Sequence, residues 1–251
     1  MVGNAACCTP APQLDSAKME KCGIKGRAMA QAKAAISVMA GLIGQVAPMV
    51  EASPSHSAQG GEIYEIGLSF ADEAARGLLP PVLRPLPGAS GGIAAYRLAG
   101  HAPVTFGYVW LDVQGHVSAS GAAARYVVGG WHSPVAAVLS ETVIQTGAAQ
   151  ITAEDGLVRF AAGDGTAGIG FALEPAARGA APEQAVTHYI HDGHRGLWLV
   201  AVPIAFDWSD AAPVDADARA LIGGDGVTGV TWAGVARNVR FLAPEISRLR
   251  G

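Results

Sequence analysis

The chain has 251 residues, of which 50% are hydrophobic and 15% are charged, with 33 glycines and 15 prolines. This composition supports a folded core and excludes wholesale disorder. The formal net charge of −4 is too small to indicate nucleic acid or an acidic substrate as a partner. Three cysteines do not make a disulfide framework, and no apolar run is long and unbroken enough to cross a membrane.

The composition changes sharply along the chain. Every lysine, methionine and cysteine lies within the first 49 residues, whereas the first aromatic residue is Tyr64. A single uniform domain is not expected to sort its residues in this way. We therefore predict an assembly arm over 1–60, made of an extended segment, a helix and a linker, and a β-rich body over 61–251. An alternative prediction divides the body into two β subdomains, about 61–195 and 196–251.

The helix predicted in the arm ends near Met49 and is rich in strong helix formers. Its apolar residues recur at alternating steps of three and four, which is the spacing of a heptad seam. Two interpretations stay open, since such a seam packs either on its own body or against copies of itself or a neighbouring subunit. In the second case the assembly interface consists of Met29, Ile36, Met39, Ile43, Val46 and Val50.

The sequence pattern of the body is typical of a β protein, because short runs of β-branched and aromatic residues alternate with Gly, Asp and Pro turns. Within Val104–Val113, the residues Phe106, Tyr108 and Trp110 fall on one face and predict a packed aromatic stripe. The spacing indicates a Gly/Ala-rich barrel or sandwich. The predicted strands are Glu62–Phe70, Ile93–Leu98, Val104–Val113, Arg125–Trp131, Leu157–Ala161, Gly168–Leu173, Ala185–Ile190, Leu197–Phe206, Val227–Ala233 and Asn238–Leu242.

One cluster has the residue types of a metal site. The string THYIHDGHRG contains three imidazoles and a carboxylate, which suit Zn²⁺ or a similar ion if a turn gathers them. The alternative is a surface turn with solvated histidines, because the order matches no standard zinc motif. The candidate ligands are His188, His191, Asp192 and His194.

Nucleophile, dinucleotide and calcium motifs are absent or incomplete in the sequence. The glycine runs do not follow the G-x-G-x-x-G order, and no G-x-S-x-G is present. The acidic segment FDWSDAAPVDAD, read as a loop, lacks the EF-hand spacing. We therefore expect no catalytic residues, no cofactor and no enzymatic activity.

The stretch from Glu141 to about Ile190 resembles the small Gly/Ala-rich β-barrel domain of tailed-phage capsid decoration, or cement, proteins. The likeness is carried by Asp155-Gly156 with Val158, by Gly168-Ile169-Gly170 with Ala172-Leu173, by Ala176-Ala177 and Gly179, and by the alternating run Ala185–Ile190. Pro182-Glu183 departs from the pattern of the family. The resemblance implies a bacteriophage structural protein that stabilises a capsid lattice without catalysis, often as a trimer.

We accordingly expect a virion protein, assembled in the host cytoplasm, whose partners are the major capsid protein or neighbouring virion subunits. A homo-oligomer, with a trimer favoured, is expected, and neither nucleic acid nor a membrane is expected as a partner. The alternatives are a metal-binding module or metal-dependent enzyme that uses the histidine cluster, another phage component such as a tail, baseplate or spike protein, and a carbohydrate-binding β protein.

Overall fold

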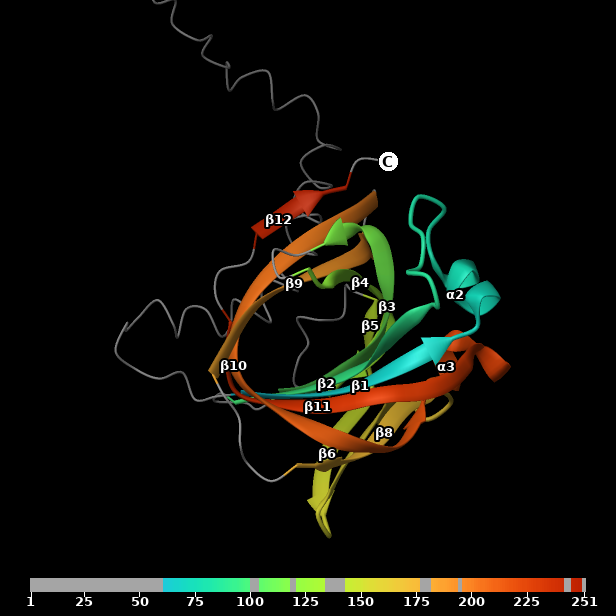
Figure 1. Ribbon diagram of the computed structural model, residues 1–251. Helices are drawn as coiled ribbons and strands as arrows, with labels where there is room; N and C mark the ends of the chain where they lie inside the picture. Colours follow the sequence, from blue (N-terminus) through green and yellow to red (C-terminus); the bar gives the residue numbers. More distant parts are fainter. Residues whose placement is uncertain are drawn as a thin grey trace, which may run out of the picture.

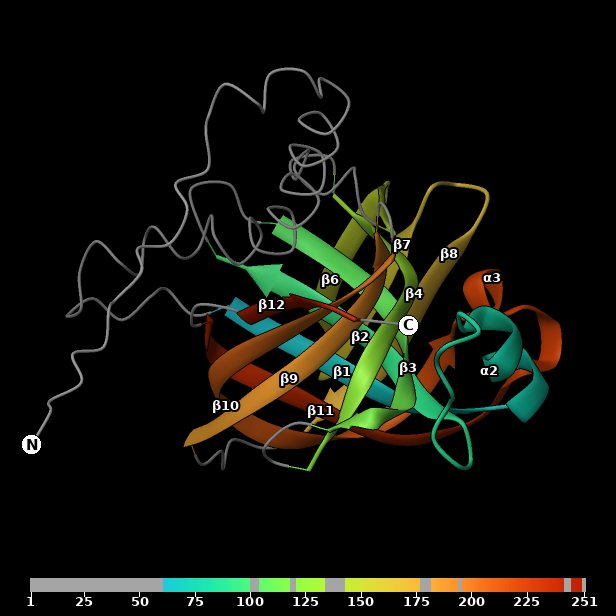
Figure 2. The ribbon, with the colours of Figure 1, turned by 90° about the horizontal axis from the view of Figure 1, so that it is seen from above.

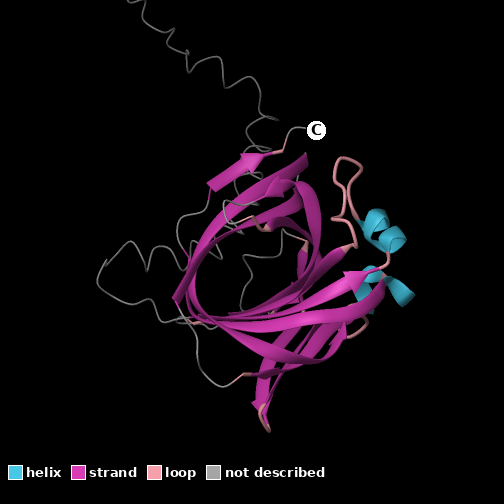
Figure 3. Cartoon of the chain, viewed as in Figure 1, coloured by secondary structure: helices cyan, strands magenta, loops and turns pink. Residues whose placement is uncertain are grey.

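The computed structural model describes residues 61–99, 104–117, 121–133, 143–176, 182–193, 196–241 and 245–249. This part of the chain is mainly β, as predicted, with two short helices and one 3₁₀ turn (Figure 3). The predicted arm over 1–60, including the whole assembly interface, lies outside the described residues. Among the described residues, no helix is long and apolar enough to cross a membrane.

The strands follow one another along the chain with the helices inserted after β1 and after β10. The helices are α2 (Asp72–Leu78) and α3 (Arg219–Ile222), and the 3₁₀ turn is η3 (Gly224–Gly226). The strands are β1 (Gly61–Phe70), β2 (Ser90–Leu98), β3 (Val104–Val117), β4 (Ala123–His132), β5 (Ile144–Thr146), β6 (Ala148–Glu154), β7 (Leu157–Gly163), β8 (Gly168–Pro175), β9 (Pro182–Gly193), β10 (Gly196–Asp217), β11 (Val227–Phe241) and β12 (Glu245–Arg248).

Seven of these strands close into a barrel. Its order is β11-β1-β2-β3-β4-β9-β10, and β10 pairs again with β11 to complete the ring (Figure 1). All of these pairings are antiparallel except that between β4 and β9, which is parallel and contains only two residue pairs, Arg125 with Tyr189 and Tyr126 with Ile190. The β4–β9 seam therefore has the shortest ladder in the ring.

A smaller sheet continues from the barrel. Beyond its pairing with β11, strand β10 pairs with β8, and β8, β7 and β6 follow as an antiparallel meander. Figures 1 and 2 show this meander beside the barrel wall, with α2 and α3 near one barrel end. Because β10 pairs with β8, β9, β11 and β12, the strands before and after position 195 belong to one sheet.

From β1 to β4, the strands of the barrel wall are mostly apolar on both faces, because both faces are largely buried. On β3, Phe106, Tyr108 and Trp110 face the barrel interior with exposed fractions of 6%, 2% and 1%, while Val109 and Leu111 face the outer core. The predicted aromatic stripe is thus confirmed. A carbohydrate-binding platform on these three rings is wrong, since the rings are buried and cannot stack on a sugar.

Glycines in the barrel wall make room for the large rings. A Cβ on Gly92 would overlap the Ile66 carbonyl oxygen and the Trp110 indole, and a Cβ on Gly107 would overlap the ring of Phe160. Each ring therefore lies directly on the backbone of a neighbouring strand. The high glycine content of the body reflects this close approach as well as the turns.

Nine described strands coincide with predicted runs, and β11 contains both of the last two runs. The sequence analysis missed β5, β6, β12 and the helices. Strand β6, with the sequence AAQITAE, has few β-branched residues and therefore gives no clear strand pattern. The prediction that the acidic segment FDWSDAAPVDAD forms a loop is wrong. Its residues 207–217 continue strand β10 through Pro213, and the last of them pair with β8.

The packing of rings on glycines can be tested by adding a single methyl group. Gly92→Ala should lower the free energy of unfolding by about 1–3 kcal/mol, because the barrel wall must shift to admit the Cβ. Gly77→Ala in α2 is the matched control, since nothing lies within 4 Å of its Cβ position and alanine favours a helix. Urea unfolding of both variants measures the difference, and equal stabilities would contradict the packing described above.

Candidate functional site

The barrel interior contains a buried ion pair between opposite parts of the wall. Arg125 on β4 donates from both terminal nitrogens to the Glu65 carboxylate on β1, with Nη1–Oε1 and Nη2–Oε2 distances of 2.5 and 3.1 Å. The side chains are only 18% and 10% exposed. Burial opposes the charge on Arg125, but the nearby carboxylate of Glu65 outweighs it and holds the pKa of Arg125 well above its usual range. Arg125 therefore stays charged.

An indole fixes the guanidinium from one face. The Arg125 Cζ lies 4.3 Å from the ring centroid of Trp110, which is the geometry of a cation–π contact. The Trp110 indole in turn donates to the Asp112 carboxylate over 3.1 Å, and the Ser90 hydroxyl donates to the same carboxylate over 2.8 Å. The position of Arg125 is thus set by β1, β2, β3 and β4 together.

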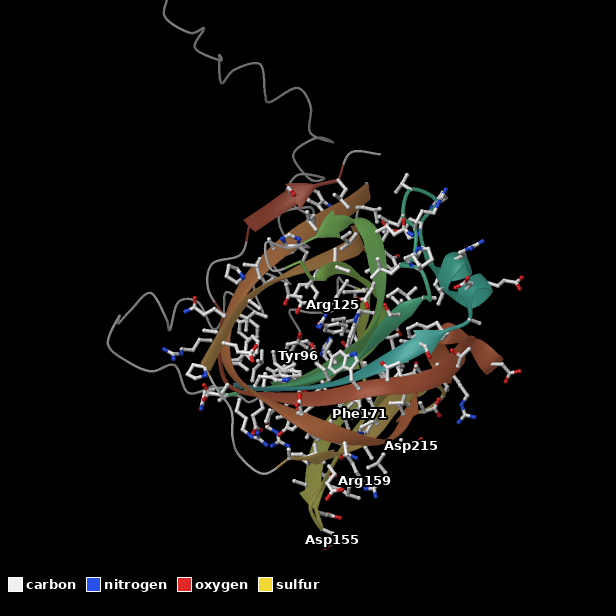
Figure 4. The ribbon with its side chains drawn as sticks, in the orientation of Figure 1. Tyr96, Arg125, Asp155, Arg159, Phe171 and Asp215 are labelled. Atoms are coloured by element: carbon white, nitrogen blue, oxygen red, sulfur yellow. The ribbon has the colours of Figure 1, made fainter. Side chains whose placement is uncertain are left out.

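Three tyrosine hydroxyls meet in the same interior. The Tyr96 oxygen on β2 lies 2.8 Å from that of Tyr108 on β3 and 3.1 Å from that of Tyr189 on β9. Burial, followed by the neighbouring tyrosines, raises the pKa of Tyr96 and of Tyr108 well above 10. At neutral pH these two hydroxyls are protonated. Figure 4 shows Tyr96 and Arg125 inside the ring of strands, whereas Phe171, Asp155, Arg159 and Asp215 lie outside it.

The contacts above do not use every donor of this interior. A guanidinium has five N–H groups, and the contacts above use two of those on Arg125. Three tyrosine hydroxyls share two hydrogen bonds, so one of their protons is left over. Surplus donors in a buried place are costly unless a ligand accepts from them. The arrangement therefore suits a ligand with carboxylate or carbonyl oxygens.

The described residues only partly cover the predicted metal cluster. His188 lies on β9, half-buried on the face opposite Tyr189, and its Nδ1 has no hydrogen-bond partner among the described residues. Asp192 is exposed near the end of the same strand. The side chain of His191 and all of His194 lie outside the described part, and within that part no three ligand-type residues gather. The metal site stays a prediction.

Sequence reasoning missed all the residues of the interior site. Tyr108 and Trp110 were predicted as packing residues, with a carbohydrate platform as the alternative, and no role at a site was predicted for Glu65, Tyr96, Arg125 or Tyr189. One signal was present, because Arg125 is the only Asp, Glu, Lys or Arg in β4, and Glu65 lies among apolar residues at the centre of β1. A buried charge needs a partner, but the sequence did not indicate which of its charges pair across the barrel.

Comparisons with solved structures identify the fold. The chain is similar to an acetoacetate decarboxylase from Legionella pneumophila with a TM-score of 0.56 and 11% identity, over 76% of this chain and 85% of that one. It is also similar, with a TM-score of 0.50 and 14% identity, to the enduracididine biosynthesis enzyme MppR complexed with the condensation product of pyruvate and imidazole 4-carboxaldehyde, over 74% and 87%. A second acetoacetate decarboxylase gives a TM-score of 0.50 and 14% identity over 76% and 87%. No protein-family model and no curated protein matches the sequence.

These likenesses overturn the interpretation as a capsid decoration protein. The solved structures that share the fold are enzymes, so the predictions of a virion structural role, of another phage component, of a virion location and of no enzymatic activity are wrong. The short Gly- and Ala-rich motifs misled because barrels in general use such residues for turns and for close packing of rings. The body of this chain has the fold of acetoacetate decarboxylase.

The buried ion pair should make stability sensitive to single substitutions. Arg125→Met leaves the Glu65 carboxylate buried without a partner and should cost about 3–5 kcal/mol, whereas the double variant with Glu65→Leu should cost clearly less. Arg97→Met is the matched control, because Arg97 pairs with Glu62 where the side chains are 39% and 31% exposed, and should cost under about 1 kcal/mol. Equal losses for the two single arginine variants, measured by urea unfolding, would show that burial does not matter here.

The tyrosines should make the protein less stable in alkali. Burial and Glu62 raise the pKa of Tyr64 to about 12, and burial raises those of Tyr96 and Tyr108 well above 10. In the unfolded chain tyrosine ionises near pH 10, so above that pH the unfolded state loses protons that the folded state keeps. The free energy of unfolding should therefore be constant below about pH 9 and fall as the pH rises through 10 and 11. Urea titrations at these pH values test this, and Tyr96→Phe should reduce the slope.

Proposed function

We propose that this protein is an enzyme that binds a small oxo acid inside the barrel and polarises its carbonyl group. The observation that carries the proposal is the surplus of buried donors on Arg125 and on the three tyrosines. Two proteins with the same fold give support, since one is an acetoacetate decarboxylase and the other is an enzyme complexed with a condensation product of pyruvate. Acetoacetate and pyruvate are both oxo acids.

Each group has a role that its position suits. Arg125 offers its unused N–H groups to the substrate carboxylate, for which a planar guanidinium is well matched. The remaining tyrosine proton is donated to the carbonyl oxygen, where negative charge develops when a proton leaves the neighbouring carbon. Donors held in place in a water-poor interior stabilise such an oxyanion without reorganisation. Glu65 holds Arg125, and its carboxylate keeps lone pairs that can accept the proton from carbon.

The proposed chemistry uses hydrogen bonds in place of an amine. Acetoacetate decarboxylase activates a lysine that forms a Schiff base with its carbonyl substrate. Here all four lysines lie between positions 18 and 33, and residues 61–251 contain none. The barrel wall itself therefore offers no lysine amine to a substrate. A proton passes from the carbon next to the carbonyl to Glu65, and the electron pair moves onto the carbonyl oxygen as an enolate.

The test is deuterium exchange at the methyl group of pyruvate, followed by proton NMR in D₂O. The full chain should accelerate the exchange, and Tyr96→Phe should slow it by roughly 10–100-fold because one oxyanion donor is lost. The double variant Glu65→Leu with Arg125→Met should abolish it, whereas Arg97→Met should leave it unchanged. Borohydride added with pyruvate should give no mass increase. No exchange above the buffer rate, or a reduced adduct on a lysine, would contradict the proposal.

A further inference from the structure

A group of three indoles in the barrel interior is not used by the roles described above. The ring centroids of Trp110 and Trp232 lie 6.5 Å apart, and those of Trp232 and Trp208 lie 6.2 Å apart. Phe206 extends the series, 6.1 Å from Trp208. These rings come from β3, β10 and β11, and Trp110 is the ring on which the Arg125 guanidinium lies. A continuous row of aromatic rings therefore begins at the buried ion pair.

The three indoles are held in fixed positions. Each lies across a glycine of a neighbouring strand, since a Cβ on Gly92, Gly67 or Gly234 would overlap the ring of Trp110, Trp232 or Trp208 respectively. Two of them also repeat one hydrogen bond. In the sequences WLD and WSD, the indole N–H donates to the carboxylate two residues later, over 3.1 Å to Asp112 and 3.2 Å to Asp210. Such rings lose little side-chain entropy when a ligand stacks on them.

Exposure differs along the row and is greatest at its second ring, Trp232. Trp110 is 1% exposed, Trp208 is half-buried and Trp232 is 39% exposed. Val230, two residues before Trp232 on β11, is 41% exposed. An exposed indole is unusual among the residues that face a barrel interior, and its one face already rests on Gly67. The row therefore connects the buried charges to solvent and presents flat apolar surface there.

We infer that Trp232 and Trp208 form a subsite for a planar apolar group, so that the preferred substrate is an oxo acid with an aromatic substituent. This inference rests on the proposed function, because the substrate carboxylate is placed on Arg125 next to Trp110. The substituent then extends along the row toward Trp232. Ring stacking on rigid indoles adds affinity beyond simple area burial. The carboxylates of Asp112 and Asp210 accept from the N–H groups of Trp110 and Trp208 at the ring edges, so these two hydrogen bonds do not cover the ring faces.

The experiment compares pyruvate with phenylpyruvate by isothermal titration calorimetry on the full chain. The protein should bind phenylpyruvate at least about tenfold more tightly than pyruvate. Trp232→Leu should remove most of this preference while leaving the affinity for pyruvate unchanged. Trp232→Phe retains a ring and should retain most of the preference. Trp198→Leu is the matched control, because Trp198 lies at the other end of β10, paired with His191 and Arg248, and should leave the preference intact.

The outcomes separate this inference from the function on which it rests. If both acids bind equally and Trp232→Leu changes neither affinity, while the double variant of Glu65 and Arg125 loses both, the aromatic subsite is wrong and the oxo-acid site stands. If neither acid binds the wild-type protein, the proposed function fails, and the subsite fails with it. A loss of preference in Trp198→Leu as large as that in Trp232→Leu would also overturn the subsite.

Discussion

The structure depends on the ion pair between Glu65 and Arg125. Arg125 lies in the β4–β9 seam, where the ring of strands is closed by only two residue pairs, and its side chain crosses the interior to β1. Removing two charges from water costs free energy, which their attraction offsets only when geometry and further contacts are good. The paired hydrogen bonds and the Trp110 ring provide those contacts. Barrel closure and the electrostatics of the interior are thus linked through one residue.

Around that pair, the rest of the interior is packed by placing large aromatic rings against glycines, which have no side chain. Aromatic residues line the space that seven strands enclose, and glycines on neighbouring strands let the rings approach the backbone. The same principle operates outside the wall, where Gly107 admits Phe160 of the smaller sheet. The high glycine and alanine content, which suggested the resemblance to a capsid protein, is needed here because small residues leave room for these rings. Short motifs of small residues therefore indicate tight packing, whichever function the fold performs.

The sequence was sufficient for nine of the twelve described strands and insufficient for their assembly. Alternation on β3 correctly placed Phe106, Tyr108 and Trp110 on one face, because that pattern is local. Barrel closure depends on pairings between distant segments, such as β1 with β11 and β4 with β9, which local periodicity does not contain. The continuation of β10 through Asp215 was hidden by its prolines and aspartates, which usually mark turns. The candidate site was missed for the same reason, since its residues come from β1, β2, β3, β4 and β9.

Strand β10 links these parts in a way that bears on how the protein unfolds. It runs through 22 residues and forms ladders with β9 and then β8 along its length, and with β12 and then β11. Neither the barrel nor the smaller sheet can lose this strand without exposing the core of the other. We therefore expect local opening of either sheet to be coupled to the other, and amide hydrogens at the centre of β10 to exchange with solvent only when the whole body opens. A cooperative unfolding of the body is the consequence to expect from this one shared strand.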